Sequence, residues 1–279
     1  MAFGSSAPEI MVAATASFNG ATDTAVGNAL GSNITNIALV LGLTALLKPL
    51  SIASGTLKKE MPVLLAFSLL AVYLLSDFLL TRVEGIILIS LFFLFIGGLT
   101  WMSFNMELND PILSETESEI PSGVPTSKAI LWLVVGMILL PLSAHFMVNS
   151  AEIIARHFGL SELVIGLTII AIGTSLPELA ASIASILKKE ADIAIGNIIG
   201  SNMFNILAVL GIPALINPDY FASEVLTRDY PAMMGLSLLL GAMIFISSKG
   251  KLVRTEGAIL LACFIGYQYI LFSQTIMTT

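Results

Sequence analysis

Residues 173–178 read GTSLPE and residues 196–205 read GNIIGSNMFN, two polar stretches within strongly apolar sequence. Both occur a second time near the start of the chain, where residues 4–9 read GSSAPE and residues 27–36 read GNALGSNITN. Adding 169 to a position in the first copy gives its counterpart, and 19 of 46 aligned positions are identical. Such self-similarity indicates an internal repeat, and paired repeats of membrane proteins often form a binding site where they meet. The duplication therefore predicts two related halves that share one site.

The composition is that of a membrane protein. Of 279 residues, 56% are apolar and only 11% are charged, whereas a soluble domain carries about 25% charge. Helices of ~20 residues give this length room for about nine or ten membrane spans. The single cysteine, Cys263, lies in an apolar run and offers neither a disulfide nor a thiolate metal site. We therefore expect a multi-pass protein whose partner is the lipid bilayer and not a nucleic acid.

Apolar runs of helical length predict nine transmembrane segments. They cover residues 4–18, 24–47, 61–77, 84–103, 129–150, 161–187, 192–216, 230–247 and 255–273. A full helix precedes GTSLPE in the second copy, but only three residues precede GSSAPE in the first. A complete pair of halves calls for roughly 40 further residues at the front. We therefore expect an all-α membrane fold with about nine helices present of ten.

The basic residues predict which helix ends face the cytoplasm, because loops rich in Lys and Arg stay inside. Nine basic residues fall on one side of the predicted helices, namely Lys48, Lys58, Lys59, Lys128, Lys188, Lys189, Lys249, Lys251 and Arg254. Only three fall on the other side, namely Arg82, Arg156 and Arg228. The equivalent loops 18–20 and 187–189 carry no lysine and two lysines respectively, so they face opposite sides. The repeats are therefore expected to be inverted.

We divide the chain into three parts on this basis. A first inverted repeat, incomplete at its start, covers residues 1–103, a linker covers 104–127 and a second inverted repeat covers 128–279. The linker carries three prolines and five acidic residues, as a hydrated connecting segment does. The charge pattern places this linker in the cytoplasm and the C-terminus on the outer side of the cell (inner) membrane.

Two acidic residues belong in the middle of the predicted membrane helices, Glu9 and its counterpart Glu178. A charge at that depth costs at least ~2.5–3.5 kcal/mol on insertion scales and needs a partner. Neither neighbourhood offers a Lys or Arg, so a bound cation is the simplest counter-charge. The alternative is a protonated carboxyl buried for packing, which explains a symmetric pair less well than a single residue.

The residues ahead of each glutamate supply further oxygens. Pro8 and Pro177 leave the carbonyl four residues back without its helical N–H, and irregular backbone at membrane depth survives only where it is buried or lines a watery cavity. Carbonyls near Ala2 and Ala171 are therefore candidate ligands. Hydroxyls three and four residues before the glutamates lie on the same helical face, and they belong to Ser5, Ser6, Thr174 and Ser175.

The second polar stretch adds a serine and an asparagine at i, i+4 spacing in each copy. These pairs are Ser32 with Asn36 and Ser201 with Asn205. Glycines spaced four residues apart favour close helix packing, and they are Gly27, Gly31, Gly196 and Gly200. Interhelical hydrogen bonds are expected from the remaining asparagines, Asn28, Asn33, Asn197 and Asn202. We expect helix N-capping from Asp23 and Asp192.

Carboxylate, hydroxyl, amide and carbonyl oxygens together form a hard-cation site. Ca²⁺ takes 6–8 oxygens with flexible geometry, whereas Mg²⁺ demands a tight octahedron. The motifs contain no Cys or His, which disfavours zinc and copper. The sequence therefore predicts a site for a hard cation, and no organic cofactor.

These motifs resemble the α-repeats of the calcium/cation antiporter superfamily, and most closely the bacterial and archaeal sodium/calcium exchangers of inner membranes. The resemblance covers nearly the whole chain and implies ten helices in two inverted halves with four central ion sites. It implies a calcium site made of Glu9, Glu178 and the carbonyls of Ser5 and Thr174. Sodium sites would use the side chains of Ser6, Ser32, Ser175 and Ser201 and the carbonyls of Ala2 and Ala171. Asn36 and Asn205 occupy positions where the family has Asn or Asp.

The expected function is electrogenic antiport, in which several Na⁺ moving down their gradient drive one Ca²⁺ out. Two alternatives remain: exchange of Ca²⁺ for H⁺ or another cation, and a truncated, transport-inactive membrane fragment. No nucleophile–base set lies on the predicted helices, so an enzyme is not expected.

Overall fold

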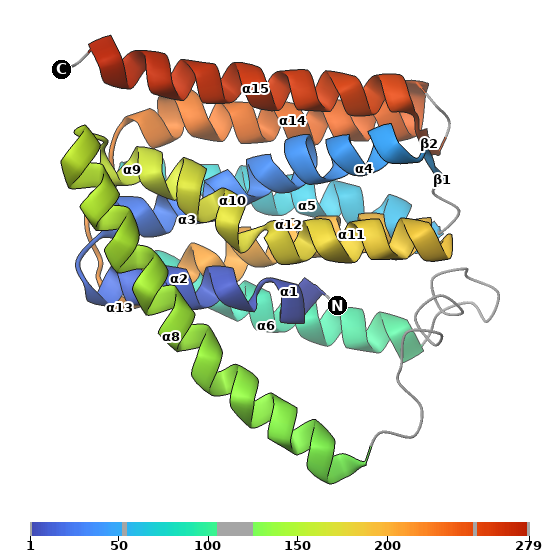
Figure 1. Ribbon diagram of the computed structural model, residues 1–279, viewed down its shortest axis with the longest axis horizontal. Coiled ribbons are helices and arrows are strands. Elements are labelled where there is room, and N and C mark those ends of the chain that lie inside the picture. The colour runs from blue at the N-terminus through green and yellow to red at the C-terminus, as the bar shows by residue number, and fades with distance from the viewer. Residues whose placement is uncertain (1, 52–54, 105–124, 248–249, 278–279) are drawn as a thin grey trace.

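A computed structural model describes residues 2–51, 55–104, 125–247 and 250–277. In these ranges the chain forms nine helical segments, as predicted, three of them interrupted by a single non-helical residue, and a two-stranded sheet (Figure 1). The first half contains α1 (Ala2–Ser5), α2 (Ala7–Phe18), α3 (Thr22–Ile34), η1 (Thr35–Leu41), α4 (Gly42–Leu47), β1 (Leu50–Ser51), α5 (Gly55–Leu74) and α6 (Arg82–Phe104). The second half contains α8 (Thr126–Phe158), α9 (Glu162–Ile165), η2 (Gly166–Ile170), α10 (Ala171–Thr174), α11 (Leu176–Lys188), α12 (Ala191–Phe204), η3 (Asn205–Val209), α13 (Gly211–Ile216), η4 (Val225–Asp229), α14 (Tyr230–Ala242), η5 (Met243–Ser247), β2 (Lys251–Leu252) and α15 (Arg254–Met277).

Six of the described helices are long and apolar enough to cross a membrane. They are Thr22–Leu47, Arg82–Trp101, Glu162–Lys188, Ala191–Ile216, Val225–Ile246 and Arg254–Ser273. Residues 105–124, most of the predicted linker, lie outside the described part of the chain. The chain is an all-α membrane protein in the ranges that can be examined.

The two copies of the repeat have the same backbone but run in opposite directions. A non-helical residue separates α1 from α2 and α10 from α11: Ser6 has φ −85° and ψ 4°, and its counterpart Ser175 has φ −84° and ψ 1°. Each second polar stretch then passes from an α-helix into a π-helix, at η1 and at η3. Figure 1 shows α2 and α11 running antiparallel to each other, as inverted repeats require.

The relation between the halves extends beyond the aligned motifs. β1 pairs with β2 antiparallel, while an isolated bridge joins Leu79 to Tyr220 in the opposite loops. The last helix of each half packs against the other half, α6 on α13 and α15 on α4. At these crossings Gly85 faces Ala214 and Gly257 faces Ala45. The sequence signal is RVEG at 82–85 and RTEG at 254–257, which the repeat alignment did not include.

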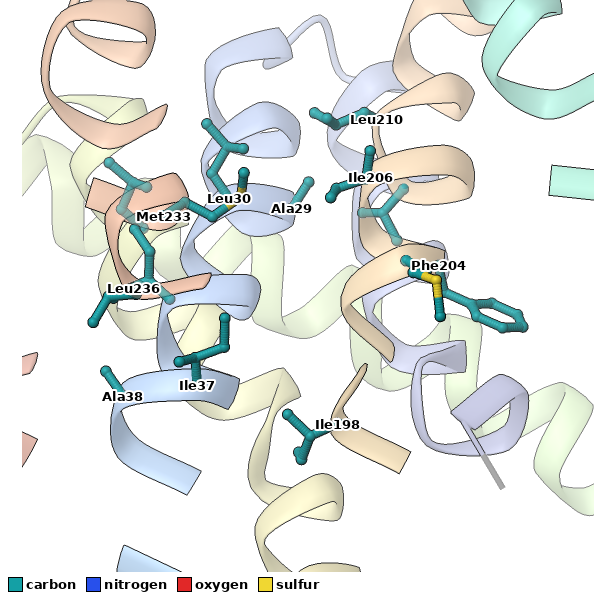
Figure 2. Close-up of a cluster of buried hydrophobic side chains, with 14 of the residues drawn as sticks. Ala29, Leu30, Ile37, Ala38, Ile198, Phe204, Ile206, Leu210, Met233 and Leu236 are labelled. Atoms are coloured by element: carbon teal, nitrogen blue, oxygen red, sulfur yellow. The ribbon is translucent and has the colours of Figure 1, made fainter. Parts of the chain in front are cut away.

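Part of the apolar core lies where α3 and η1 pack against α14 on one side and α3 packs against η3 on the other (Figure 2). Leu30 of α3 lies beside Met233 of α14, and Ile37 of η1 lies on the side of Leu236. Phe204 of α12 stacks edge-on against Phe92 of α6, with ring centroids 5.0 Å apart. Burying these side chains fixes α3 and α12 in the centre of the bundle.

Several predicted details are wrong. The helix predicted at 129–150 continues to Phe158, and the helix predicted from 230 starts five residues earlier as η4. The caps of α3 and α12 are Ala21 and Glu190, and neither makes a side-chain capping hydrogen bond. Asp23 instead accepts a hydrogen bond from the backbone N–H of Ala222, 2.8 Å away, because that N–H lies in the adjacent loop. N-capping by Asp23 and Asp192 is therefore not observed.

Candidate cation site

Glu9 and Glu178, which are counterparts under the repeat, occupy equivalent positions directly after the two helix breaks. Glu9 is the third residue of α2 and Glu178 the third of α11, each directly after the proline of its motif. Both side chains have no exposed surface. A buried pair of like charges needs a counter-charge or a proton.

One hydrogen-bond chain links Glu178 to the first repeat. The Ser201 hydroxyl donates to Oε1 of Glu178 over 3.3 Å. Ser5 lies 3.5 Å from the Ser201 hydroxyl and donates to Oδ1 of Asn197 over 3.3 Å. Ser5 of α1 thus contacts the second polar stretch of the other repeat, which the sequence alone did not predict.

The counterpart residues form a second chain around Glu9. The Thr174 hydroxyl lies 3.3 Å from that of Ser32 and donates to Oδ1 of Asn28 over 3.3 Å. The Asn28 amide donates to the backbone carbonyl of Glu9 over 3.1 Å. The hydroxyls of Ser5 and Thr174 therefore each contact one asparagine and one serine of the opposite repeat, as a pseudo-twofold relation requires. The interhelical role predicted for Asn28 agrees with these contacts.

The second pair of asparagines in each repeat also reaches across. The side chain N–H of Asn36 donates to Oδ1 of Asn202 over 3.0 Å, and that of Asn205 donates to Oδ1 of Asn33 over 3.0 Å. All four residues are buried. The two bonds are exchanged by the same +169 relation that connects the motifs.

Buried oxygens without a hydrogen-bond partner are concentrated on the predicted ligands. Seven such atoms are Oγ of Ser6 and Ser175, both carboxylate oxygens of Glu9, Oε2 of Glu178, and Oδ1 of Asn36 and Asn205. Buried polar atoms are nearly always satisfied, so each exception needs an explanation. Several other buried helical hydroxyls bond to the carbonyl four residues back, as Ser17, Thr44 and Thr168 do. The Ser6 and Ser175 hydroxyls are oriented differently.

Of the two alanine carbonyls predicted as ligands, only that of Ala171 can be assigned hydrogen-bond partners. The Ala171 carbonyl accepts hydrogen bonds from the Ser175 N–H, at 3.1 Å, and from the Thr174 hydroxyl, at 3.3 Å. It is therefore not a carbonyl that the proline has left unpaired, and an ion there would share it. Ala2 belongs to α1, but its surroundings are not described.

This donor set fits a hard cation. Within the described ranges neither glutamate forms an ion pair with Lys or Arg, and no three His, Cys, Asp or Glu side chains gather in one place. Two carboxylates and several neutral oxygens remain. Oxygen-only ligation suits Ca²⁺ and Na⁺ and does not suit the metals that select sulfur or imidazole.

The chain is similar to known proteins over most of its length. The family described as sodium/calcium exchanger protein matches residues 1–101 and 128–273. The "Putative antiporter CaxA" of Alkalimonas amylolytica is 53% identical over 98% of this chain and 86% of that protein. The "Inner membrane protein YrbG" of Escherichia coli is 43% identical over 86% of this chain and 74% of that protein.

Archaeal proteins show the same likeness in sequence and in three dimensions. The "Sodium/calcium exchanger MaX1" of Methanosarcina acetivorans is 30% identical over 98% of this chain and 87% of that protein. A solved structure of the sodium–calcium exchanger NCX_Mj, soaked with Na⁺ and Ca²⁺, superposes with a TM-score of 0.68. It is 32% identical and covers 95% of this chain and 82% of that one. The residues matched by the family, 1–101 and 128–273, include both copies of the two polar motifs.

Proposed function

Because the chain belongs to the sodium/calcium exchanger protein family of membrane antiporters, we propose that it exchanges Na⁺ for Ca²⁺ across the inner membrane by alternating access. Glu9 and Glu178 are the central ion ligands. The observation that carries this proposal is the set of seven unpaired buried oxygens, of which three belong to the two carboxylates and four to neighbouring hydroxyl and amide groups. A cation site explains all seven together, whereas packing alone leaves each at a cost of about 1–3 kcal/mol.

Competition for the carboxylates couples the two ions. A single Ca²⁺ neutralises both Glu9 and Glu178, and Na⁺ ions can do so only when more than one is bound. Because two buried like charges are unfavourable without a counter-ion, the site favours one occupied state or the other. Downhill Na⁺ binding therefore displaces Ca²⁺, which is the basis of antiport.

The remaining ligands divide between the two ions. Ca²⁺ would take the carboxylates together with the backbone carbonyls of Ser5 and Thr174, next to the helix breaks. Na⁺ would use neutral oxygens, which suit its single charge. These are the hydroxyls of Ser6, Ser32, Ser175 and Ser201, the amide oxygens of Asn36 and Asn205, and the carbonyls of Ala2 and Ala171.

The basic loops support an orientation in the membrane. The ends of α4 and α11 carry Lys48 and Lys188, and the rule that basic loops stay inside places these ends in the cytoplasm. Residues 104–127 then lie in the cytoplasm and connect a first half, 1–103, to a second half, 128–279. The C-terminus lies on the outer side.

Isotope flux into proteoliposomes tests the function. An outward Na⁺ gradient is expected to drive ⁴⁵Ca²⁺ uptake, and Glu178→Gln is expected to abolish it because one carboxylate is lost. Glu224→Gln is the matched control, since Glu224 is exposed in the loop before η4, and it should retain full flux. Uptake driven by a pH gradient and indifferent to Na⁺ would instead support Ca²⁺/H⁺ exchange. Absence of any ion-driven flux would contradict antiport.

A further inference from the structure

Asn33 and Asn202, which are not among the expected ligands, determine the orientation of the side-chain amides of two expected ligands, Asn205 and Asn36. The amide N–H of Asn205 donates to Oδ1 of Asn33 at 3.0 Å. Asn33 in turn donates its own N–H to the backbone carbonyl of Asn202 at 3.3 Å and lies 3.4 Å from the sulfur of Met233. A backbone carbonyl only accepts hydrogen bonds, so it fixes which end of the Asn33 amide faces it.

The orientation is passed from one residue to the next. Because the Asn33 N–H donates to the Asn202 carbonyl, Asn33 offers only its Oδ1 to Asn205. Asn205 must therefore donate its own N–H to that oxygen. The Oδ1 of Asn205 then points away from this contact, where it has no hydrogen-bond partner although it is fully buried. A flipped Asn205 would place two oxygens against each other and turn its N–H₂ toward the cation, and both changes are unfavourable.

The ligand asparagine of the first repeat, Asn36, makes the counterpart of the Asn205–Asn33 bond. Asn36 donates to Oδ1 of Asn202 at 3.0 Å, and Oδ1 of Asn36 is likewise buried and unpaired. Asn36 and Asn205 each lie four residues after a serine of the predicted site, Ser32 or Ser201. The unpaired amide oxygens therefore continue the line of ligands along α3 and α12.

We propose that Asn33 and Asn202 are positioning residues of the cation site, each of which holds the ligand asparagine of the opposite repeat with its carbonyl oxygen toward the ion. The inference rests on the proposed function, in which Asn36 and Asn205 are ligands. It assigns a chemical task to the asparagine of each GSN triplet. It also explains why the bonds cross between repeats, because each ligand is then oriented by the half to which it does not belong.

The two oxygens of a carboxylate are equivalent, so an aspartate can bind a cation in either orientation, whereas an asparagine cannot. This difference provides the test. Asn33→Leu keeps the shape of the side chain but removes the acceptor, so Asn205 is released to flip. Because Asn205 is proposed as a Na⁺ ligand, equilibrium ²²Na⁺ binding to the purified protein should weaken by about tenfold. Adding Asn205→Asp should restore binding in the Asn33→Leu background, since either carboxylate oxygen serves. In the wild-type background the same Asn205→Asp change should weaken binding, because its oxygen faces Oδ1 of Asn33.

The opposite signs of Asn205→Asp in the two backgrounds are the decisive result, and additive effects would overturn the proposal. Asn36→Asp in the Asn33→Leu background is the control, because it adds the same charge but its own partner, Asn202, is intact; it should not restore binding. The twin cycle of Asn202→Leu with Asn36→Asp repeats the test if one variant fails to fold. A wild-type protein that binds neither Ca²⁺ nor Na⁺ would overturn the proposed function itself.

Discussion

At the scale of single residues, buried hydroxyl groups differ in whether a hydrogen bond within their own helix satisfies them. Ser237 is buried in α14 and donates to the Met233 carbonyl at 3.0 Å, which satisfies it locally. Ser175 is equally buried, but its hydroxyl has no partner. Both residues read as small polar side chains in an apolar helix, so residue type alone could not separate them. Its place three residues before the glutamate of GTSLPE singled out Ser175, since Ser237 also has a serine counterpart in the first half, Ser68.

This difference predicts the effects of two otherwise similar substitutions. Ser175→Ala removes an oxygen proposed to bind Na⁺, and we expect the Na⁺ concentration for half-maximal exchange to rise about tenfold, the equivalent of ~1.4 kcal/mol. Ser237→Ala removes only a local hydrogen bond and should leave that concentration unchanged. Na⁺ titration of ⁴⁵Ca²⁺ flux in proteoliposomes measures both. Equal shifts in the two variants would remove Ser175 from the ligand set.

At the scale of helices, the predicted role of the glycines in α3 is confirmed by backbone contact. A Cβ on Gly27 would lie 2.8 Å from the Leu163 carbonyl oxygen, and one on Gly31 would lie 2.7 Å from both Leu167 Cα and Ala171 Cβ. The four-residue spacing therefore marks the face on which α3 meets α9, η2 and α10. The helices that pack on this face could not be predicted, because the glycine spacing gives no information about which distant segment contacts it.

Gly31→Ala should consequently destabilise the protein by about 1–3 kcal/mol, because the new methyl group has no room between two backbones. Gly97→Ala is the matched control. Nothing lies within 4 Å of a Cβ built there in α6, and alanine favours a helix over glycine by up to about 1 kcal/mol. Thermal unfolding in detergent should show a lower midpoint for the first variant and an unchanged or higher one for the second. A tolerated Gly31→Ala would mean that α3 and η2 can separate without loss.

Helix ends were less predictable than helix centres. The sequence pattern starts the segment containing α14 at residue 230, because Arg228 and Asp229 read as a polar loop. In the structure they belong to η4, where Arg228 donates to Asp229 at 2.7 Å and Tyr267 donates to the same carboxylate at 2.8 Å. The charge of Asp229 is compensated by residues on two helices, one of them 38 positions away. A hydropathy window cannot detect such a distant partner.

At the scale of the whole molecule, the inversion was predictable from charge and repetition together. The duplicated motifs predicted two equivalent halves, and the unequal lysine content of loops 18–20 and 187–189 predicted that they face opposite sides. The antiparallel courses of α2 and α11 confirm that the two halves are inverted relative to each other (Figure 1). The crossing of α6 and α15 to the opposite halves was not predicted, because it depends on contacts far apart in the chain.

The side of the membrane that each half faces is open to a direct test. Asn19 and Lys188 are counterparts under the repeat and both are exposed at helix ends. In a Cys263→Ser background, Asn19→Cys should react with an impermeant maleimide on intact cells, because its loop carries no basic residue and lies outside. Lys188→Cys should react only in inside-out vesicles. The same-sided reaction of both variants would mean that the halves are parallel, and the shared central site would then lose its pseudo-twofold geometry. Reversed labelling would keep the inverted repeats and the site but place residues 104–127 outside, against the distribution of lysines.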